Sequence, residues 1–138
     1  MTTARRAALA LALALTGCTR QQPAPTPQAP HGGSLHKLSD GRNSVEVVQD
    51  GSGKPEGSKL LLYFCDAQFK PISPAPTSAK LLPRGRGASA LEFKPTGDAD
   101  PAKAGELACP PIAAAVDPSG ELTATVDGKP VTAIITVR

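Results

Sequence analysis

The sequence predicts an all-β fold, a single immunoglobulin-like antiparallel β-sandwich of about seven strands. Short apolar runs alternate with polar residues at a period of two, and no segment shows a sustained helical period. Turn signals containing Gly or Pro separate these runs. Because the chain has three Phe, one Tyr and no Trp, its core must consist mainly of Val, Leu, Ile and Ala.

The first predicted strands form an antiparallel hairpin. The sequence VEVV at 45–48 places Val45 and Val47 on one face of a strand. The denser run from Ser58 to Cys65 is typical of a strand covered on both faces. Asp50-Gly51 begins a Gly- and Pro-rich turn between the two.

Later segments continue the strand pattern. Leu91 and Phe93 alternate with polar residues, as do the apolar residues of 122–126 and 131–137. Asp127-Gly128 between the last two runs predicts a C-terminal hairpin. The segment Ile112 to Val116 has a second interpretation, a single helical turn.

The N-terminus has the three parts of an export signal. Arg5 and Arg6 precede nine apolar residues, Ala7 to Leu15, and small residues lead to Cys18. A helix of this length reaches about 14 Å, roughly half the hydrocarbon core of a bilayer, so a membrane-spanning helix is disfavoured.

The residues Leu15-Thr16-Gly17-Cys18 resemble the lipobox of bacterial lipoproteins. The resemblance implies cleavage after residue 17 and lipid attachment to Cys18. It places the mature chain in the cell envelope, on a membrane facing the periplasm, and on the outer membrane if the cell is Gram-negative. An ordinary signal peptide containing a cysteine, or a short buried helix, remains the alternative.

The mature chain is divided into a tether and one domain. Residues 18–30 are rich in Pro and lack large apolar side chains, which is typical of a disordered, extended spacer. Residues 31–138 are long enough for a single β-sandwich. The Pro-rich segments 70–76 and 95–103 are predicted to connect one sheet to the other.

The cysteines predict a disulfide. Once Cys18 carries lipid, Cys65 and Cys109 form an even pair in an oxidising compartment. A bridge between them would enclose 43 residues, closer to a structural crosslink than to a reactive CxxC pair. Two separate buried thiols are the alternative.

Charge and motifs exclude several function classes. Removal of residues 1–17 takes Arg5 and Arg6 away and lowers the formal charge from +3 to +1, so no basic patch argues for nucleic acid binding. The chain has two His residues, outside any nucleophile motif, and no phosphate-binding glycine loop, CxxC or HExxH. We therefore do not expect an enzyme.

A transition-metal site is the sharper functional hypothesis. His31 and His36 flank Gly32-Gly33, whose flexibility would let both imidazoles approach one Cu or Zn ion. Two ligands do not close a site, so Glu46 or Asp66 would have to supply another.

Four segments together resemble a group of small exported HGG-containing β-sandwich domains associated with metal handling: PHGGSL at 30–35, VEVV at 45–48, LLLYFCD at 60–66 before Lys70-Pro71, and TVDGKPVTAIITV at 125–137. The resemblance implies that His31, Gly32 and Gly33 form the HGG element, with Glu46 and Asp66 as its acidic partners. The chain departs from the pattern at Ser44, where the family places a histidine.

Two functions from different classes remain open. One is a Cu or Zn binding module that passes the ion to a metal-efflux protein. The other is an accessory or structural lipoprotein that engages another envelope protein and has no metal site. In the second case the HGG element only opens the first strand, with its glycines allowing a positive-φ turn.

Overall fold

The computed structural model describes residues 28–51, 57–97, 100, 103–113 and 115–137. The predicted signal segment, residues 1–17, lies outside them, as does most of the predicted tether, residues 18–30. Among the described residues, no helix is long and apolar enough to span a membrane.

Eight strands build one antiparallel sheet in the described part of the chain, in the spatial order β1-β2-β3-β6-β5-β4-β7-β8. The strands are β1 (Ser34–Lys37), β2 (Ser44–Asp50), β3 (Lys59–Cys65), β4 (Ala79–Pro83), β5 (Leu91–Pro95), β6 (Leu107–Ala108), β7 (Gly120–Val126) and β8 (Lys129–Ile135). The prediction of an all-β antiparallel fold is confirmed.

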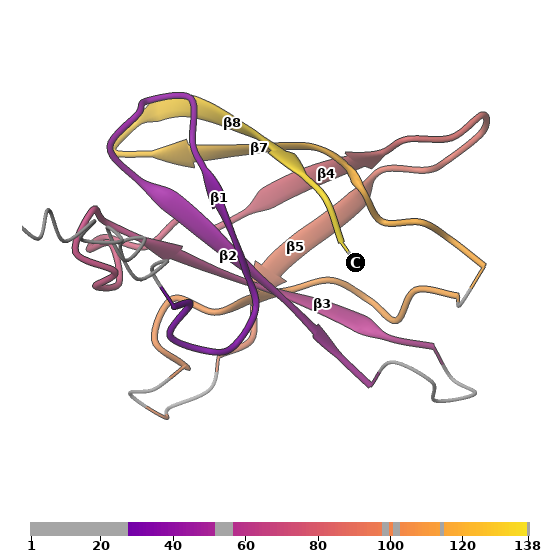
Figure 1. Cartoon of the computed structure of the whole chain (residues 1–138), viewed down its shortest axis with the longest axis horizontal. Helices are drawn as coiled ribbons and strands as arrows, with labels where there is room; N and C mark the ends of the chain where they lie inside the picture. Colours follow the sequence, from indigo (N-terminus) through magenta and orange to yellow (C-terminus); the bar gives the residue numbers. More distant parts are fainter. Residues whose placement is uncertain (1–27, 52–56, 98–99, 101–102, 114, 138) are drawn as a thin grey trace, which may run out of the picture.

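The sheet folds over into two layers and nearly closes on itself. In Figure 1, β1 and β2 cross the layer of β4 and β5, while β3 lies below β7 and β8. The two-residue strand β6 pairs with both β3 and β5 and so joins the layers on one side. On the other side, Ser39 N–H donates to the carbonyl oxygen of Thr132 at 2.8 Å, and Thr132 N–H donates to Ser39 Oγ at 3.0 Å.

The core lies between these layers and is mainly aliphatic, as the composition predicts. Strand β7 alternates buried and exposed side chains along its whole length, the pattern of a strand with one face on the core. The fully buried large side chains are Phe93, Leu60, Leu62, Leu81, Leu107, Leu122, Ile135, Glu46 and Val45. Of these, only Glu46 is charged.

Both predicted hairpins are confirmed. Strands β7 and β8 pair from Val126 and Lys129 outward around Asp127 and Gly128, whose φ angles of 51° and 73° match a type I′ turn. Strands β2 and β3 pair antiparallel from Ser44 opposite Cys65 to Asp50 opposite Lys59. Their predicted turn begins at Asp50-Gly51, and its residues 52–56 lie outside the described residues.

The segment from Ile112 to Val116 has no helix among its described residues. Ile112 instead forms an isolated bridge with Ser58, in which the two residues exchange both backbone hydrogen bonds at 2.7 and 3.1 Å. Val116 N–H donates to the carbonyl oxygen of Ala113 at 3.0 Å, so the segment combines strand pairing at one residue, Ile112, with a single turn that is not a helix.

The predicted disulfide is wrong for this structure, in which Cys65 and Cys109 are both free and buried. Cys109 N–H donates to the carbonyl of Leu60, near the start of β3, whereas Cys65 is the last residue of the same strand. Five residues of strand correspond to about 16 Å, well beyond the roughly 7 Å that a disulfide can bridge. The alternative of two separate buried thiols is the one observed.

Candidate functional site

A buried carboxylate marks the candidate site. Glu46 lies in the middle of β2 and is 1 % exposed. It is the register partner of Leu35 on β1 and of Tyr63 on β3, so these side chains share one face of the sheet. Val45 and Val47, on the opposite face, pack in the core. Glu46 therefore lies on the outer face of its layer and is buried by the segment that leads into β1.

The HGG element provides three hydrogen-bond donors to Glu46. The backbone N–H groups of His31 and Gly33 donate to Oε1 at 2.8 and 2.9 Å, and His31 Nδ1 lies 2.8 Å from Oε2. A buried carboxylate is tolerated when such donors replace the lost water. The element thus folds around one side chain of β2.

The two glycines fit this arrangement for different reasons. Gly32 has a φ of 77°, a left-handed conformation that side chains disfavour. A Cβ atom on Gly33 would lie 2.4 Å from the carbonyl oxygen of Val47, so a side chain there would push the segment away from β2. Together they let two backbone N–H groups reach one carboxylate oxygen.

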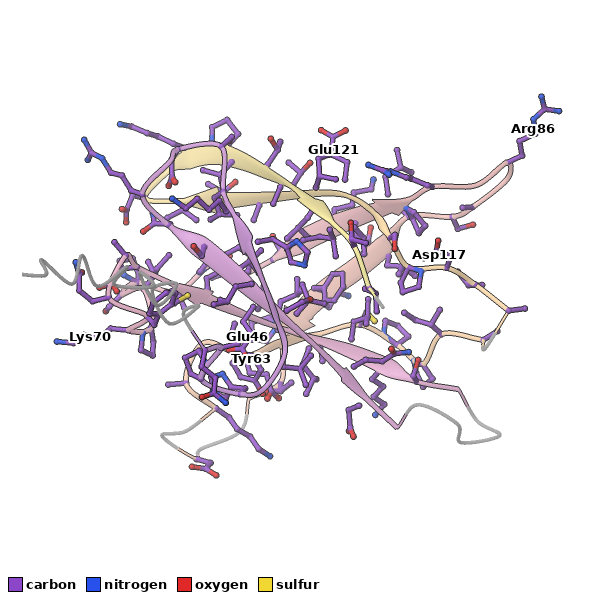
Figure 2. The ribbon with its side chains drawn as sticks, in the orientation of Figure 1. Glu46, Tyr63, Lys70, Arg86, Asp117 and Glu121 are labelled. Carbon is purple, nitrogen blue, oxygen red and sulfur yellow. The ribbon has the colours of Figure 1, made fainter. Side chains whose placement is uncertain are left out.

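A second pair of polar side chains extends the site. The His31 ring stacks on Tyr63 with ring centroids 3.8 Å apart and an interplanar angle of 10°. The Tyr63 hydroxyl donates to Glu106, which is 6 % exposed and immediately precedes β6. Burial and the hydrogen bond to Glu106 raise the pKa of Tyr63. Figure 2 shows Glu46 and Tyr63 next to each other beneath the entering segment.

A small pocket of about 200 Å³ opens beside these residues, and its lining consists of Pro30, His31, Glu46, Tyr63, Phe64, Cys65, Phe69, Pro71 and Ala104. Burial raises the pKa of the Cys65 thiol, and the charges of Glu46 and Asp66 raise it further. The thiol donates to the carbonyl oxygen of Ser44 at 3.6 Å. A protonated thiol of this kind is a poor nucleophile and a poor metal ligand.

His36 lies apart from this network. Its register partner is Val45, so it faces away from Glu46, toward the gap between β1 and β8. Its Nε2 is 3.0 Å from Ser34 Oγ, and its ring also bonds the backbone of Ile134 on β8. Burial lowers the pKa of His36, although the Ile134 bond raises it in part. His36 therefore bridges the two end strands of the sheet.

Asp66 stabilises its own loop. Its Oδ1 accepts the backbone N–H groups of Gln68 and Lys70 at 2.8 and 3.0 Å. Its backbone N–H donates to the Lys70 carbonyl at 2.9 Å. These bonds are those of an aspartate that begins a turn.

The four predicted metal ligands are thus divided among three places. His31 and Glu46 are in contact, while His36 and Asp66 are each engaged elsewhere. Within the described ranges, no group of three or more His, Cys, Asp or Glu side chains is arranged to hold a metal ion. The hydrogen bonds to Glu46 and the stacking on Tyr63 hold the segment before β1 against β2 and β3.

Sequence reasoning missed two members of the network. Tyr63 lies within the LLLYFCD segment, and the hairpin register would have placed it beside Glu46. Glu106 is 43 residues from Tyr63 and belongs to a segment with little periodicity, so no local signal pointed to it.

No family model matches the chain, and no curated protein or solved structure was found to be similar to it.

Proposed function

We propose that the chain is a lipid-anchored lipoprotein of the cell envelope, facing the periplasm, whose β-domain is an accessory module that engages another envelope protein. The anchor rests on the lipobox-like residues Leu15 to Cys18 behind an export signal. The preference for a protein partner over a metal ion rests on one observation. The carboxylate of Glu46 accepts three hydrogen bonds from the HGG element.

Those bonds engage both carboxylate oxygens of Glu46 and one ring nitrogen of His31. Oε2 of Glu46 and Nδ1 of His31 bond each other, and Oε1 accepts two backbone N–H groups. An ion bound directly by the carboxylate would have to enter beside these charge-assisted bonds, in a place where Glu46 is 1 % exposed. The HGG element is better suited to hold the domain entry in place.

The anchor is tested by feeding expressing cells an alkyne-tagged palmitate and measuring its incorporation into the chain. We expect labelling of the wild-type chain and of Cys65→Ala and Cys109→Ala, and loss of labelling in Cys18→Ala. Equal labelling of Cys18→Ala would refute lipid attachment at this residue. The two other cysteine variants control for acylation of an arbitrary thiol.

The preference over a metal is tested by thermal unfolding with Cu(II) or Zn(II). A ligand that binds only the native state raises its stability, by about 2.7 kcal/mol at a hundredfold excess over the dissociation constant. We expect neither ion, at micromolar excess, to raise the midpoint in a way that His31→Ala abolishes. A rise that depends on His31 would instead favour the metal module.

A further inference from the structure

The layer formed by β4, β5, β7 and β8 carries exposed apolar side chains on its outer face. Leu82 on β4 is 56 % exposed and Ile134 on β8 is 54 % exposed, two of the three large apolar side chains with substantial exposure in the described part of the chain. They lie in one row of the sheet, because Glu121 on β7 is the register partner of both. Figure 2 shows Glu121 at the top of the molecule, pointing outward. The row Leu82, Glu121 and Ile134 therefore faces solvent.

One charge of each sign lies beside Leu82 on this face. Glu121 is directly across the β4–β7 pair, about 5 Å away at the spacing of neighbouring strands. Lys80 is two residues along β4 on the same face, about 7 Å away. Both charged side chains are exposed, and neither forms an ion pair within the part of the chain that the structure describes. The two charges thus lie at similar distances from Leu82, in directions at right angles.

This arrangement is complementary to itself. Consider a two-fold axis that lies in the plane of a contact, passes through Leu82 and bisects the angle between the two directions. It places Lys80 of each copy opposite Glu121 of the other, and it packs the two Leu82 side chains together at the axis. The strands of the two copies then cross at about 90°, one of the two usual angles between packed sheets. Both charges and the apolar centre are satisfied by a second copy of the same face.

The same axis gives the exposed Ile134 a place. Ile134 lies two strands from Leu82, about 10 Å across the sheet. The axis therefore moves it to a point about 10 Å along β4 of the other copy, just past Lys80. A hollow of about 460 Å³ lies there, and its lining includes Ser78, Lys80 and Thr125. The isoleucine of each copy enters the hollow of the other.

We propose that the outer face of β4, β7 and β8 binds a second copy of this chain in a symmetric dimer. The occupant is the chain itself because the face supplies both members of each ion pair. The inference goes beyond the proposed function, since it needs neither lipid on Cys18 nor the absence of a metal. Such a face is smaller than a standard interface of about 20–30 residues a side, so we expect a dimer at high local concentration and a monomer at micromolar dilution.

The test captures the dimer in intact cells that express two differently tagged copies of the full-length chain. A residue at a two-fold axis meets its own copy, so Leu82→Cys should give a covalent dimer with a short bismaleimide crosslinker. The dimer is measured by isolating one tag and blotting for the other. Lys37→Cys, exposed on β1 of the other layer, is the matched control and should give at least fivefold less dimer. The wild-type chain, whose Cys65 and Cys109 are buried, gives the background.

Charge reversal tests the position of the axis. In the Leu82→Cys background, Lys80→Glu alone and Glu121→Lys alone should each lower the dimer yield at least fivefold, because each places like charges opposite one another. The double variant Lys80→Glu/Glu121→Lys should restore the yield. Coexpression of the two single-reversal chains should restore it as well, because every facing pair is again of opposite charge. Lys37→Glu should leave the yield unchanged.

The proposal is overturned if Leu82→Cys gives no more dimer than Lys37→Cys, or if the single reversals do not lower the yield. It is also overturned if exchanging both charges fails to restore the yield. A crosslinked product of one copy with a different protein overturns it in favour of that partner. None of these outcomes alters palmitate labelling of Cys18 or the thermal shift with metals, so failure of the dimer is distinguishable from failure of the proposed function.

Discussion

Replacing Glu46 by alanine should be one of the most damaging single changes in the domain. The change removes the acceptor of three hydrogen bonds and leaves the backbone N–H groups of His31 and Gly33 without their partner. Hydrogen bonds to charged groups contribute about 1.5–3 kcal/mol each, and breaking a buried ionic contact costs about 3–5 kcal/mol. Since water can reach the loosened segment, we expect a loss of about 3–5 kcal/mol in the free energy of unfolding.

The amide variant separates charge from shape. Glu46→Gln keeps a carbonyl oxygen for the two backbone donors and turns an N–H₂ group toward His31 Nδ1, which can accept a hydrogen bond after a change of tautomer. We therefore expect a smaller loss, about 1–2 kcal/mol. Both values are measured by urea unfolding of residues 19–138, a segment that contains every strand of the described fold.

Glu121 supplies the matched control, because it lies on β7 and is exposed. Glu121→Ala and Glu121→Gln should change the free energy of unfolding by no more than about 0.5 kcal/mol. If Glu46→Ala costs no more than Glu121→Ala, the three hydrogen bonds do not stabilise the fold, and the argument for a structural HGG element fails.

Three further predictions concern backbone space, thiols and pH. Gly33→Ala should lower the free energy of unfolding in urea by about 2 kcal/mol or more, because the added Cβ would lie 2.4 Å from the carbonyl oxygen of Val47 on β2. Gly85→Ala is the control and should be neutral, because its nearest contact is at 3.8 Å. Equal effects of the two substitutions would contradict this prediction. Two thiols should react with Ellman's reagent when residues 19–138 are unfolded without reductant. In the native state both should react slowly, because burial raises the pKa values of Cys65 and Cys109. The absence of a reactive thiol after unfolding would indicate the disulfide. The folded-state pKa of His36 lies below its unfolded value of about 6.5, so its contribution to stability is complete above that pH and is lost as pH falls through the folded pKa. His36→Asn should therefore flatten the fall of unfolding free energy as pH decreases below about 6.5, and an unchanged slope would refute the role of this side chain.

The fold was predictable where the local pattern is strong. The hairpin at Asp127-Gly128 combines a turn dipeptide with alternating apolar residues on both sides, and its observed register follows directly. The two-residue strand β6 has no such pattern, and it exists because Leu107 and Ala108 bridge β3 and β5. Strands of this kind are specified by long-range pairing, which a local period does not reveal.

The disulfide prediction failed for the same reason, because it depends on a long-range strand pairing that the local sequence pattern does not reveal. Cysteine number and compartment favoured a bridge between Cys65 and Cys109, but bridging depends on register. Because β6 meets the early part of β3, Cys109 lies opposite Leu60 and not beside Cys65. The sequence alone contains no local signal for that register.

The candidate site was half predictable. The HGG element and Glu46 were recognised as related, and the structure brings them together. The chemistry assigned to them could not be checked from sequence, because a His beside a carboxylate serves equally as a metal ligand and as a structural hydrogen-bond pair. The three bonds to Glu46 favour the structural pair, and His36 and Asp66 are each engaged elsewhere.

The position of the Glu46 contacts also has a mechanical consequence. Any force applied to the chain before residue 28 enters the fold through Pro30 and reaches His31 and Gly33 before the β1–β2 pairing that begins at Ser34. Pulled from its end, an antiparallel strand would peel one hydrogen bond at a time. Here the charge-assisted bonds to one buried carboxylate carry the load first. The bonds from His31 and Gly33 to Glu46 therefore have to break before the force reaches the edge strand β1.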